Sequence, residues 1–323
     1  MKMQNTISPR NSRLKRVWML ILLAMTLAGA QQGVQAQQDA QYSQYMFNQL
    51  VYNPAYTGSR EALSATVLLR RQWLGYVGGP ATGNISVHAP IANERHGVGF
   101  MFAQDHLGVT STSNVALSYA YRLPVGTGFL NLGLNAGVMQ YKTKFSEVHP
   151  MDPDPIKPNV DVSALLPRAG AGAYFHTPKF FAGFSVPNLL AGRYFGTSNP
   201  TAGLLASKQS MHFFTMAGAI LPMGSNVSFR PSAVLKMVPH SPMQVDINTT
   251  FFFAKVLGIG VGYRTSDALV FMLEYQSLRR FRAGYAFDMT LSPLRNTNSG
   301  SHELMIGVDL GWGKANFMTP RYF

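Results

Sequence analysis

The residues of this chain best suited to metal chemistry are histidines and aspartates. His96 and His106 flank one apolar segment, and Asp105 stands beside the second histidine. Imidazole and carboxylate groups are common metal ligands, but polar residues at the rim of a β-structure are the better interpretation here. The eight histidines form no His-Glu-x-x-His motif, so the pattern does not indicate a zinc peptidase.

A second candidate is the proline-rich stretch that contains Asp152, Asp154 and Asp161. Clustered carboxylates bind calcium through their oxygens, so calcium binding by residues 151–161 stays open. The alternation of Asp with Pro more simply indicates a stiff, hydrated loop.

No pattern for nucleophilic or redox catalysis occurs in the sequence. The absence of cysteine excludes a thiol nucleophile, a disulfide framework and Cys-ligated zinc. There is no Gly-x-Ser-x-Gly elbow. The glycine-rich run at 258–262 resembles a dinucleotide fingerprint, but it lies within a predicted strand and opens no helix. The sequence therefore predicts a protein that is not an enzyme and has no cofactor.

Residues 1–36 have the order of a secretory signal peptide. Basic residues come first, residues 17–28 form a short apolar core, and Val34-Gln35-Ala36 places small residues at −3 and −1 of a cleavage site. An uncleaved signal anchor is the alternative. We expect cleavage near Ala36 and export from the cytoplasm.

The rest of the chain is poor in charge. Charged residues make up 13% of the sequence, against about 25% in soluble domains, and no apolar run of about 18 residues follows position 30. A barrel in lipid has this composition because polar inward residues alternate with apolar outward ones. The net charge is +13, and it falls to +8 without the five basic residues of the expected signal peptide. The remaining Lys and Arg form no dense basic helix, so we expect contact with outer-membrane lipid and no nucleic-acid binding.

Apolar and polar residues alternate with the period of two that is typical of β-strands. In residues 244–253, Val245, Ile247 and Phe251 fall on one face and Asp246 and Asn248 on the other. Such segments are about 9–11 residues long, enough to cross a bilayer at a tilt, whereas soluble strands have a mode of about 5–6 residues. A soluble secreted β-sandwich is the alternative, and it would dissolve without detergent.

We predict an all-β fold, a transmembrane antiparallel β-barrel of about fourteen strands, in the outer membrane. Tight turns are expected at 124–128, 222–226 and 265–267, and long connections at 143–167 and 188–210. The expected strands are 61–71, 82–90, 96–104, 113–123, 128–142, 168–176, 179–187, 211–221, 226–237, 243–253, 256–264, 268–277, 279–289 and 301–311.

Residues 37–60 precede the first strand and are rich in aromatic residues. This density is too high for a free tail, so we predict that the segment folds into the barrel lumen like a plug; a disordered linker is the alternative. The barrel itself is expected to span 61–323. The residues expected to fill the lumen or contact a partner are Tyr45, Phe47, Asn53, Pro54 and Tyr56.

Charged residues within the strands have to face water, so we expect them in the lumen. Cations and anions would pair there in a structural role, and an ion path is the alternative. The expected lumen charges are Arg230, Lys236, Glu274, Arg280, Arg282, Asp288, Glu303 and Asp309.

Several spaced blocks carry a resemblance to a known family. They are QQDAQYSQYMFN at 37–48, YNPAYTG at 52–58, RQW at 71–73, FSVPNLL at 184–190, YRTSDA at 263–268, YAFDMTLSPLRNTNSGS at 285–301 and PRYF at 320–323. Together they resemble the PorP/SprF family of the type IX secretion system, over nearly the whole chain after residue 36.

The resemblance implies an outer-membrane barrel of Bacteroidota that works with type IX secretion components. Some family members support secretion or surface anchoring of large adhesins with C-terminal sorting domains, including gliding-motility adhesins. No catalytic residues are implied. The alternative function is an outer-membrane transporter for hydrophobic substrates, because Asn53-Pro54-Ala55 also resembles the plug of fatty-acid transporter barrels.

Overall fold

The computed structural model describes residues 40–60, 62–91, 94–148, 161–190, 210–239, 241–277 and 280–311. The expected signal peptide, Asp152, Asp154 and the block at 320–323 lie outside the described residues. Among the residues described, no helix is long and apolar enough to cross a membrane.

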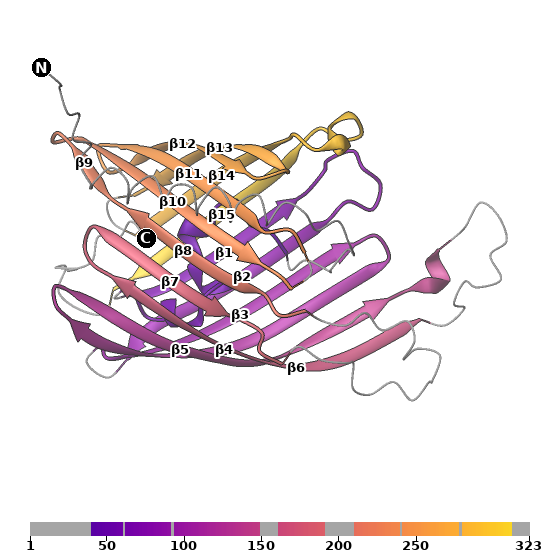
Figure 1. The fold of residues 1–323 in the computed structure, drawn as a ribbon, viewed down its shortest axis with the longest axis horizontal. Helices are drawn as coiled ribbons and strands as arrows, with labels where there is room; N and C mark the ends of the chain where they lie inside the picture. The colour runs from indigo at the N-terminus through magenta and orange to yellow at the C-terminus, as the bar shows by residue number, and fades with distance from the viewer. Residues whose placement is uncertain are drawn as a thin grey trace, which may run out of the picture.

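Antiparallel strands dominate the described chain, preceded by three short 3-10 helices (Figure 1). The helices before the first strand are η1 (Tyr45–Phe47), η2 (Gln49–Val51) and η3 (Pro54–Tyr56), and two more, η4 (Phe145–Glu147) and η5 (Pro293–Asn296), lie in connections. The strands are β1 (Leu63–Arg71), β2 (Ala81–Ile91), β3 (His96–Leu107), β4 (Thr110–Val125), β5 (Gly128–Thr143), β6 (Val162–His176), β7 (Phe180–Val186), β8 (Phe213–Ala219), β9 (Leu221–Met223), β10 (Val227–Met237), β11 (Gln244–Phe253), β12 (Leu257–Arg264), β13 (Ala268–Gln276), β14 (Phe281–Thr290) and β15 (Ser301–Leu310).

The strands close into a ring of fourteen. Consecutive strands pair, apart from β8 and β9, and β15 pairs with β1 to close the ring. The short β9 follows β8 after Ile220, and both pair with β10, so together they occupy one place in the wall. Closure gives each of the fourteen places in the ring a paired strand on both sides, over part or all of its length, as a barrel in lipid requires. The predicted transmembrane barrel of about fourteen strands is confirmed.

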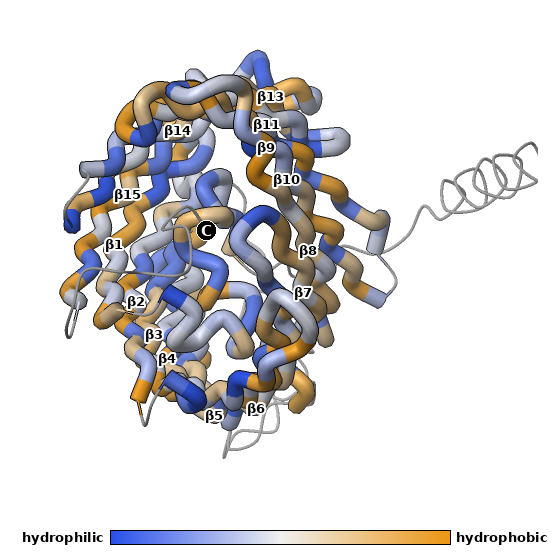
Figure 2. The backbone as a smooth tube through the Cα atoms, turned by 90° about the vertical axis from the view of Figure 1, so that its left-hand side faces the viewer, coloured by the Kyte–Doolittle hydropathy of each residue, from blue (hydrophilic) through white to orange (hydrophobic). Residues whose placement is uncertain are grey.

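The two faces of the wall differ in polarity in many of the strands. In β1, for example, Ser64, Thr66 and Arg70 are buried while Val67 and Leu69 are exposed. In Figure 2, which looks along the barrel, hydrophilic and hydrophobic positions alternate along the strands of the ring. The buried polar face is the lumen and the exposed apolar face is the one that meets lipid.

The two ends of the barrel carry different connections. Seven connections start and finish at the end that we call the loop end: five longer ones, at 72–80, 144–161, 187–212, 238–243 and 291–300, and two short ones, at 108–109 and 265–267. Six connections of two to four residues, at 92–95, 126–127, 177–179, 224–226, 254–256 and 277–280, lie at the opposite end, which we call the turn end. Because β1 begins and β15 finishes at the turn end, both ends of the barrel wall are there.

The sequence placed several strand limits wrongly. Residues 162–167, expected in a long connection, belong to β6 and pair with β5, including Pro167 opposite Val138. The prolines there suggested a loop, but these residues are paired with β5 in an antiparallel ladder. Val162, Ala164 and Leu166 are buried and alternate with exposed residues, as in the rest of the strand. The expected turn at 124–128 is shorter, because Pro124 pairs with Phe129 inside the hairpin. Pro222 and Met223, expected in the turn at 222–226, form part of β9.

Candidate functional site

The N-terminal segment, residues 40–60, lies inside the ring of strands (Figure 1). Residues 42–60 are buried apart from the half-buried Val51. The five residues expected in a plug are all within this buried stretch. They pack with inward side chains of the wall. The centroids of the Tyr56 and Tyr174 rings are 5.4 Å apart, and the hydroxyl of Tyr45 lies 3.1 Å from the Ser232 Oγ.

Asn53 fixes the second half of the segment. Its side-chain oxygen accepts a hydrogen bond from the backbone N–H of Ala55 at 2.9 Å, which caps η3 with Pro54 at its first position. Its amide nitrogen donates to the carbonyl of Ala173 in β6 at 3.0 Å. The turn is therefore built and anchored to the wall by one side chain.

Glycines of the wall let this half approach closely. A Cβ added at Gly133 would lie 2.3 Å from the Ala55 nitrogen, and one added at Gly172 would overlap the Asn53 side chain. Any side chain at Gly133 would have to displace the backbone of the segment, since the nearest atoms belong to that backbone. The inward faces of β5 and β6 are therefore complementary in shape to the segment.

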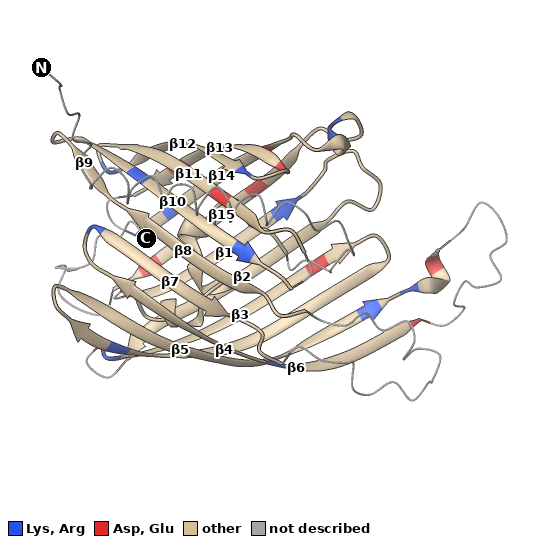
Figure 3. Ribbon diagram, viewed as in Figure 1, with Lys and Arg blue, Asp and Glu red and all other residues tan. Residues whose placement is uncertain are grey.

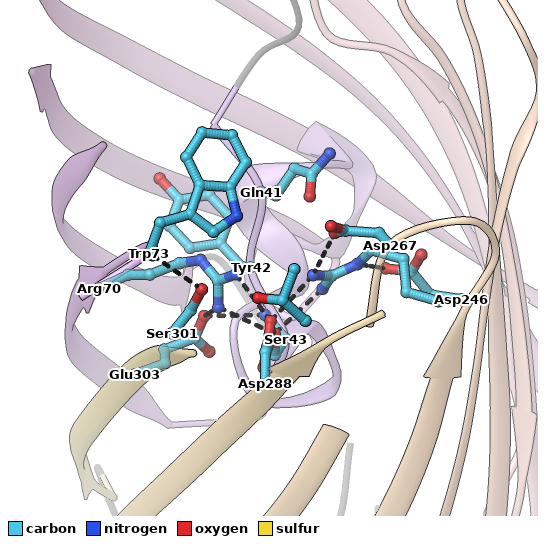
Figure 4. Close-up of polar contacts among 12 residues, drawn as sticks. Gln41, Tyr42, Ser43, Arg70, Trp73, Asp246, Asp267, Asp288, Ser301 and Glu303 are labelled. Carbon is cyan, nitrogen blue, oxygen red and sulfur yellow. Dashed lines mark hydrogen bonds and ion pairs between the residues drawn. The ribbon is translucent and has the colours of Figure 1, made fainter. Parts of the chain in front are cut away.

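Ser43 is the polar centre of the first half (Figure 4). Its hydroxyl lies 2.8 Å from both carboxylate oxygens of Asp288, and it accepts hydrogen bonds from Arg70 and Arg264, each at 3.0 Å. The backbone N–H groups of Ser43 and Gln44 donate to the two oxygens of Glu303, each at 2.8 Å. Four strands of the wall are thereby joined through one serine and its neighbour.

The charges around Ser43 form a chain of alternating sign, which we call the ion network. It runs from the Lys236 ammonium to Asp246 (2.8 Å), to Arg264 (3.2 Å), to Asp288 (2.9 Å), to Arg70 (2.7 Å) and to Glu303 (3.2 Å). All six side chains are at least nine-tenths buried. Taking such charges out of water is costly, and only complete pairing with further hydrogen bonds offsets the cost.

A second, smaller cluster lies nearer the turn end. The Arg60 guanidinium makes two hydrogen bonds to Asp309, at 3.2 and 3.0 Å, and Arg282 donates to the same carboxylate at 3.3 Å. Arg282 also donates to the carbonyl of Phe47 at 3.3 Å. The segment thus runs from the ion network toward the loop end to Arg60 near the turn end, through the length of the lumen.

Burial controls the protonation of the segment's tyrosines. Burial raises the pKa of Tyr45 and of Tyr52 well above the usual value. Both phenols therefore stay neutral and add no charge to the lumen, and the Tyr52 hydroxyl accepts a hydrogen bond from the backbone N–H of Tyr42 at 3.1 Å.

The expected lumen charges separate into four groups in the structure. Lys236, Asp288 and Glu303 belong to the ion network, and Arg282 and Asp309 to the second cluster. Arg230 and Glu274 line a cavity of about 20 Å³, with the Arg230 guanidinium 3.4 Å from the centre of the Phe252 ring. Arg280 is exposed in the turn before β14. Arg280 is two positions before the inward Arg282 and would share its face in a longer strand, but β14 begins only at Phe281.

Sequence reasoning missed five members of these clusters: Ser43, Arg60, Arg70, Asp246 and Arg264. The three charged residues within strands could have been found, because each falls on the polar face of its strand. Ser43 carries no such signal, since a small neutral residue outside the strands gives no indication of its partners.

The paired charges and hydrogen bonds hold the N-terminal segment in the lumen. The network's carboxylates are occupied by cations, and among the described residues no group of three or more His, Asp or Glu could hold a metal ion. Asp161, from the stretch considered for calcium, is exposed and accepts a hydrogen bond from the backbone of Ser146.

A family profile described as type IX secretion system membrane protein PorP/SprF matches residues 34–308. The chain belongs to the PorP/SprF family. This PorP/SprF protein is an outer-membrane component of the type IX secretion system, and both its family and its fold are of non-enzymatic kinds. The resemblance noted from the sequence blocks is confirmed.

Several solved outer-membrane barrels are similar to the PorP/SprF chain. The toluene transporter TbuX of Ralstonia pickettii has a TM-score of 0.48 at 8% identity, covering 88% of this chain and 97% of that one. Omp33 of Acinetobacter baumannii has a TM-score of 0.43 at 10% identity (78% and 99%), and a FadL homologue of Pseudomonas aeruginosa has 0.41 at 11% identity (83% and 93%). At these scores the similarities carry no argument about function. A search of curated proteins gave no match.

Proposed function

We propose that this protein is a closed, passive barrel that supports secretion or surface anchoring of large adhesin-type proteins, including gliding-motility adhesins with C-terminal sorting domains. The observation that carries the proposal is the N-terminal segment, which is buried and tied to the wall by the ion network. A segment held in this way acts as a plug, because moving it would leave buried charges without partners.

The loop end offers the surface on which a client would be held. The backbone N–H of Leu74 donates to the Gly300 carbonyl and the N–H of Ser299 donates to the Leu74 carbonyl, both at 2.8 Å. These bonds join the connections 72–80 and 291–300 into one rim, from which Val77 projects with 96% of its surface exposed. A preorganised rim lowers the ordering cost of binding.

The orientation of the barrel agrees with this role. In bacterial outer-membrane barrels the longer loops are extracellular and the short turns periplasmic. The loop end of this protein would then face the cell surface and its adhesin clients, and the turn end would face the periplasmic components of the secretion system. Residues 1–36 would direct export and be removed near Ala36, in a cell of the Bacteroidota.

Co-purification tests the proposal. The protein is isolated in mild detergent from its native outer membrane, and bound proteins are identified by mass spectrometry. We expect a large surface adhesin or type IX components, and we expect Val77→Asp to reduce adhesin recovery. The matched control is Ala254→Asp, which places the same charge in an exposed connection at the turn end. Recovery of the protein alone, with steady conductance in planar bilayers, would overturn the proposal.

The transporter alternative requires an apolar pocket beside the segment. A lumen cavity of about 120 Å³ does lie there, lined by Tyr42, Tyr52 and Phe214, but also by Asp105 and Arg168. A charged lining disfavours hydrophobic cargo, because charges lose hydration against it. Uptake of a hydrophobic compound by liposomes that contain the protein would favour the alternative.

A further inference from the structure

Formal charge is almost excluded from the lipid-facing side of the wall. Strand alternation and pairing place every Asp, Glu, Lys and Arg of the described strands on the inward face, except two residues, Arg71 and Lys142. Figure 3 shows how few charged positions the strands carry among long uncharged stretches. A charge on the lipid face is costly at the midplane and tolerated near the headgroups, and both exceptions lie within the last two residues of a strand, at the loop end.

Arg71 lies in a groove of the outer wall. The groove has a volume of about 460 Å³ and lies over β15, β1, β2 and β3. Direct cross-strand pairing places His302, Arg71, Ala81 and His106 in one row on the outward face. His302 is further oriented by a hydrogen bond at 2.6 Å with the Tyr285 hydroxyl. One end of the groove is therefore lined by a guanidinium and two imidazoles.

No acidic group of the described wall neutralises this end. The carboxylate nearest in sequence to His302 is Glu303, which faces the lumen and pairs there with Arg70. Among the described residues, Arg71 forms no ion pair. The groove thus presents positive charge and hydrogen-bond donors on a surface where an anion has to come from outside the protein.

Apart from Gln104, the outward side chains in the rest of the groove are apolar or small, and the groove is hollow there. Leu69 and Leu304 border it, and Gly83 and Ala81 leave space between them. A Cβ added at Gly83 would make only an ordinary contact with Leu69, at 3.6 Å. A cationic end that continues into an apolar hollow matches a lipid, with its phosphate at the row of basic residues and an acyl chain below it.

We propose that this groove binds the phosphate of a lipid A-type glycolipid of the outer leaflet. Arg71 would hold the phosphate by paired N–H donors, with His106 and His302 donating from either side, and an acyl chain would lie over Gly83. The site is separate from the lumen and goes beyond the proposed role in secretion, since it concerns the lipid contacts of the barrel wall.

Native mass spectrometry of the full chain in detergent tests the proposal. The probes are purified lipid A and the same lipid with its phosphate removed. We expect the phosphorylated form to be retained at least about fivefold more, which corresponds to one basic residue acting near a membrane surface. Equal retention of the two forms would overturn the site, and this comparison needs only the wild-type protein.

Two variants locate the site. Arg71→Gln removes the cation and Gly83→Leu fills the hollow, and each should lower lipid A retention about fivefold. Lys142→Gln is the matched control, because it removes the other outward charge outside the groove and should leave retention unchanged. Folding is checked by the heat-dependent mobility of the barrel in gels. An equal loss in the control, or displacement of the lipid by inorganic phosphate alone, would contradict a lipid site.

Discussion

The two halves of the N-terminal segment are held in the lumen by different kinds of interaction. Residues 41–48 are held by charge: Ser43 and Gln44 hydrogen-bond into the ion network of β1, β12, β14 and β15. Residues 52–58 are held by shape, with Asn53 and Ala55 pressed against glycines of β5 and β6. Removing one partner from a buried charge network destabilises it, whereas a close-packed contact is destabilised by adding atoms. Single substitutions can therefore release one half and leave the other in place.

The largest effect is expected for Asp288→Ala. This change leaves Arg70 and Arg264 buried without their shared carboxylate, and breaking a buried pair in this way costs about 3–5 kcal/mol. Hydrogen exchange with mass spectrometry should show faster exchange in peptides from 41–48 and little change in 52–58. Uniform acceleration of both halves would contradict their independence.

Gly133→Val should produce the reverse pattern. The added side chain overlaps the backbone of Pro54 and Ala55, and overpacking of this kind costs about 1–3 kcal/mol. Exchange should increase in 52–58 and stay slow in 41–48. Gly126→Val is a poor control because the φ of Gly126 is positive. Gly83→Val is the matched variant, because a Cβ at Gly83 makes only an ordinary contact with Leu69 on the outer face, and it should leave the lumen unaffected.

Asn53→Ala removes the cap of η3 and the hydrogen bond to Ala173 while adding no atoms. The loss of a cap costs about 0.5–2 kcal/mol. Denaturant unfolding of the detergent-solubilised barrel, followed by tryptophan fluorescence, measures the change. Asn53→Ser keeps a side-chain oxygen that can cap η3 without burying a charge and should recover part of the loss; a serine variant as weak as Asn53→Ala would show that the cap contributes little.

The smallest effect is expected for Tyr45→Phe. It removes the hydroxyl, which is hydrogen-bonded to Ser232, and keeps the ring in the core, so we expect a loss of about 0.5–1.5 kcal/mol. The same unfolding assay applies, with Ser232→Ala as the second member of a double-mutant cycle. Additive effects of the two changes would mean that the hydroxyl groups do not stabilise each other.

The barrel could be predicted from the sequence because the period of two is a local signal. Val245 and Asp246 show by themselves which faces are apolar and polar. The extension of β6 through Pro167 was missed because pairing with Val138, distant in sequence, decides it. Arg280 was wrongly predicted to face the lumen because the alternation of the sequence continues one residue beyond the start of β14.

The site was predictable only in outline. The aromatic density of residues 37–60 indicated packing, and Asn53-Pro54 indicated a turn. That Ser43 joins Asp288, Arg70 and Arg264 depends on three strands meeting around one hydroxyl, which no spacing along the chain expresses. Hydrogen bonds between residues more than 200 positions apart follow from closure of the ring.

Closure of the ring is also coupled to the segment that the ring encloses. The seam between β1 and β15 is fully paired from Leu63–Leu310 to Arg71–His302, and the segment that precedes β1 lies within the ring it closes. The segment bonds to both sides of this seam, because Ser43 is hydrogen-bonded to Arg70 of β1 and to Glu303 of β15. It therefore holds the first strand of the wall to the last, and its release would loosen the ring at the seam that closes it.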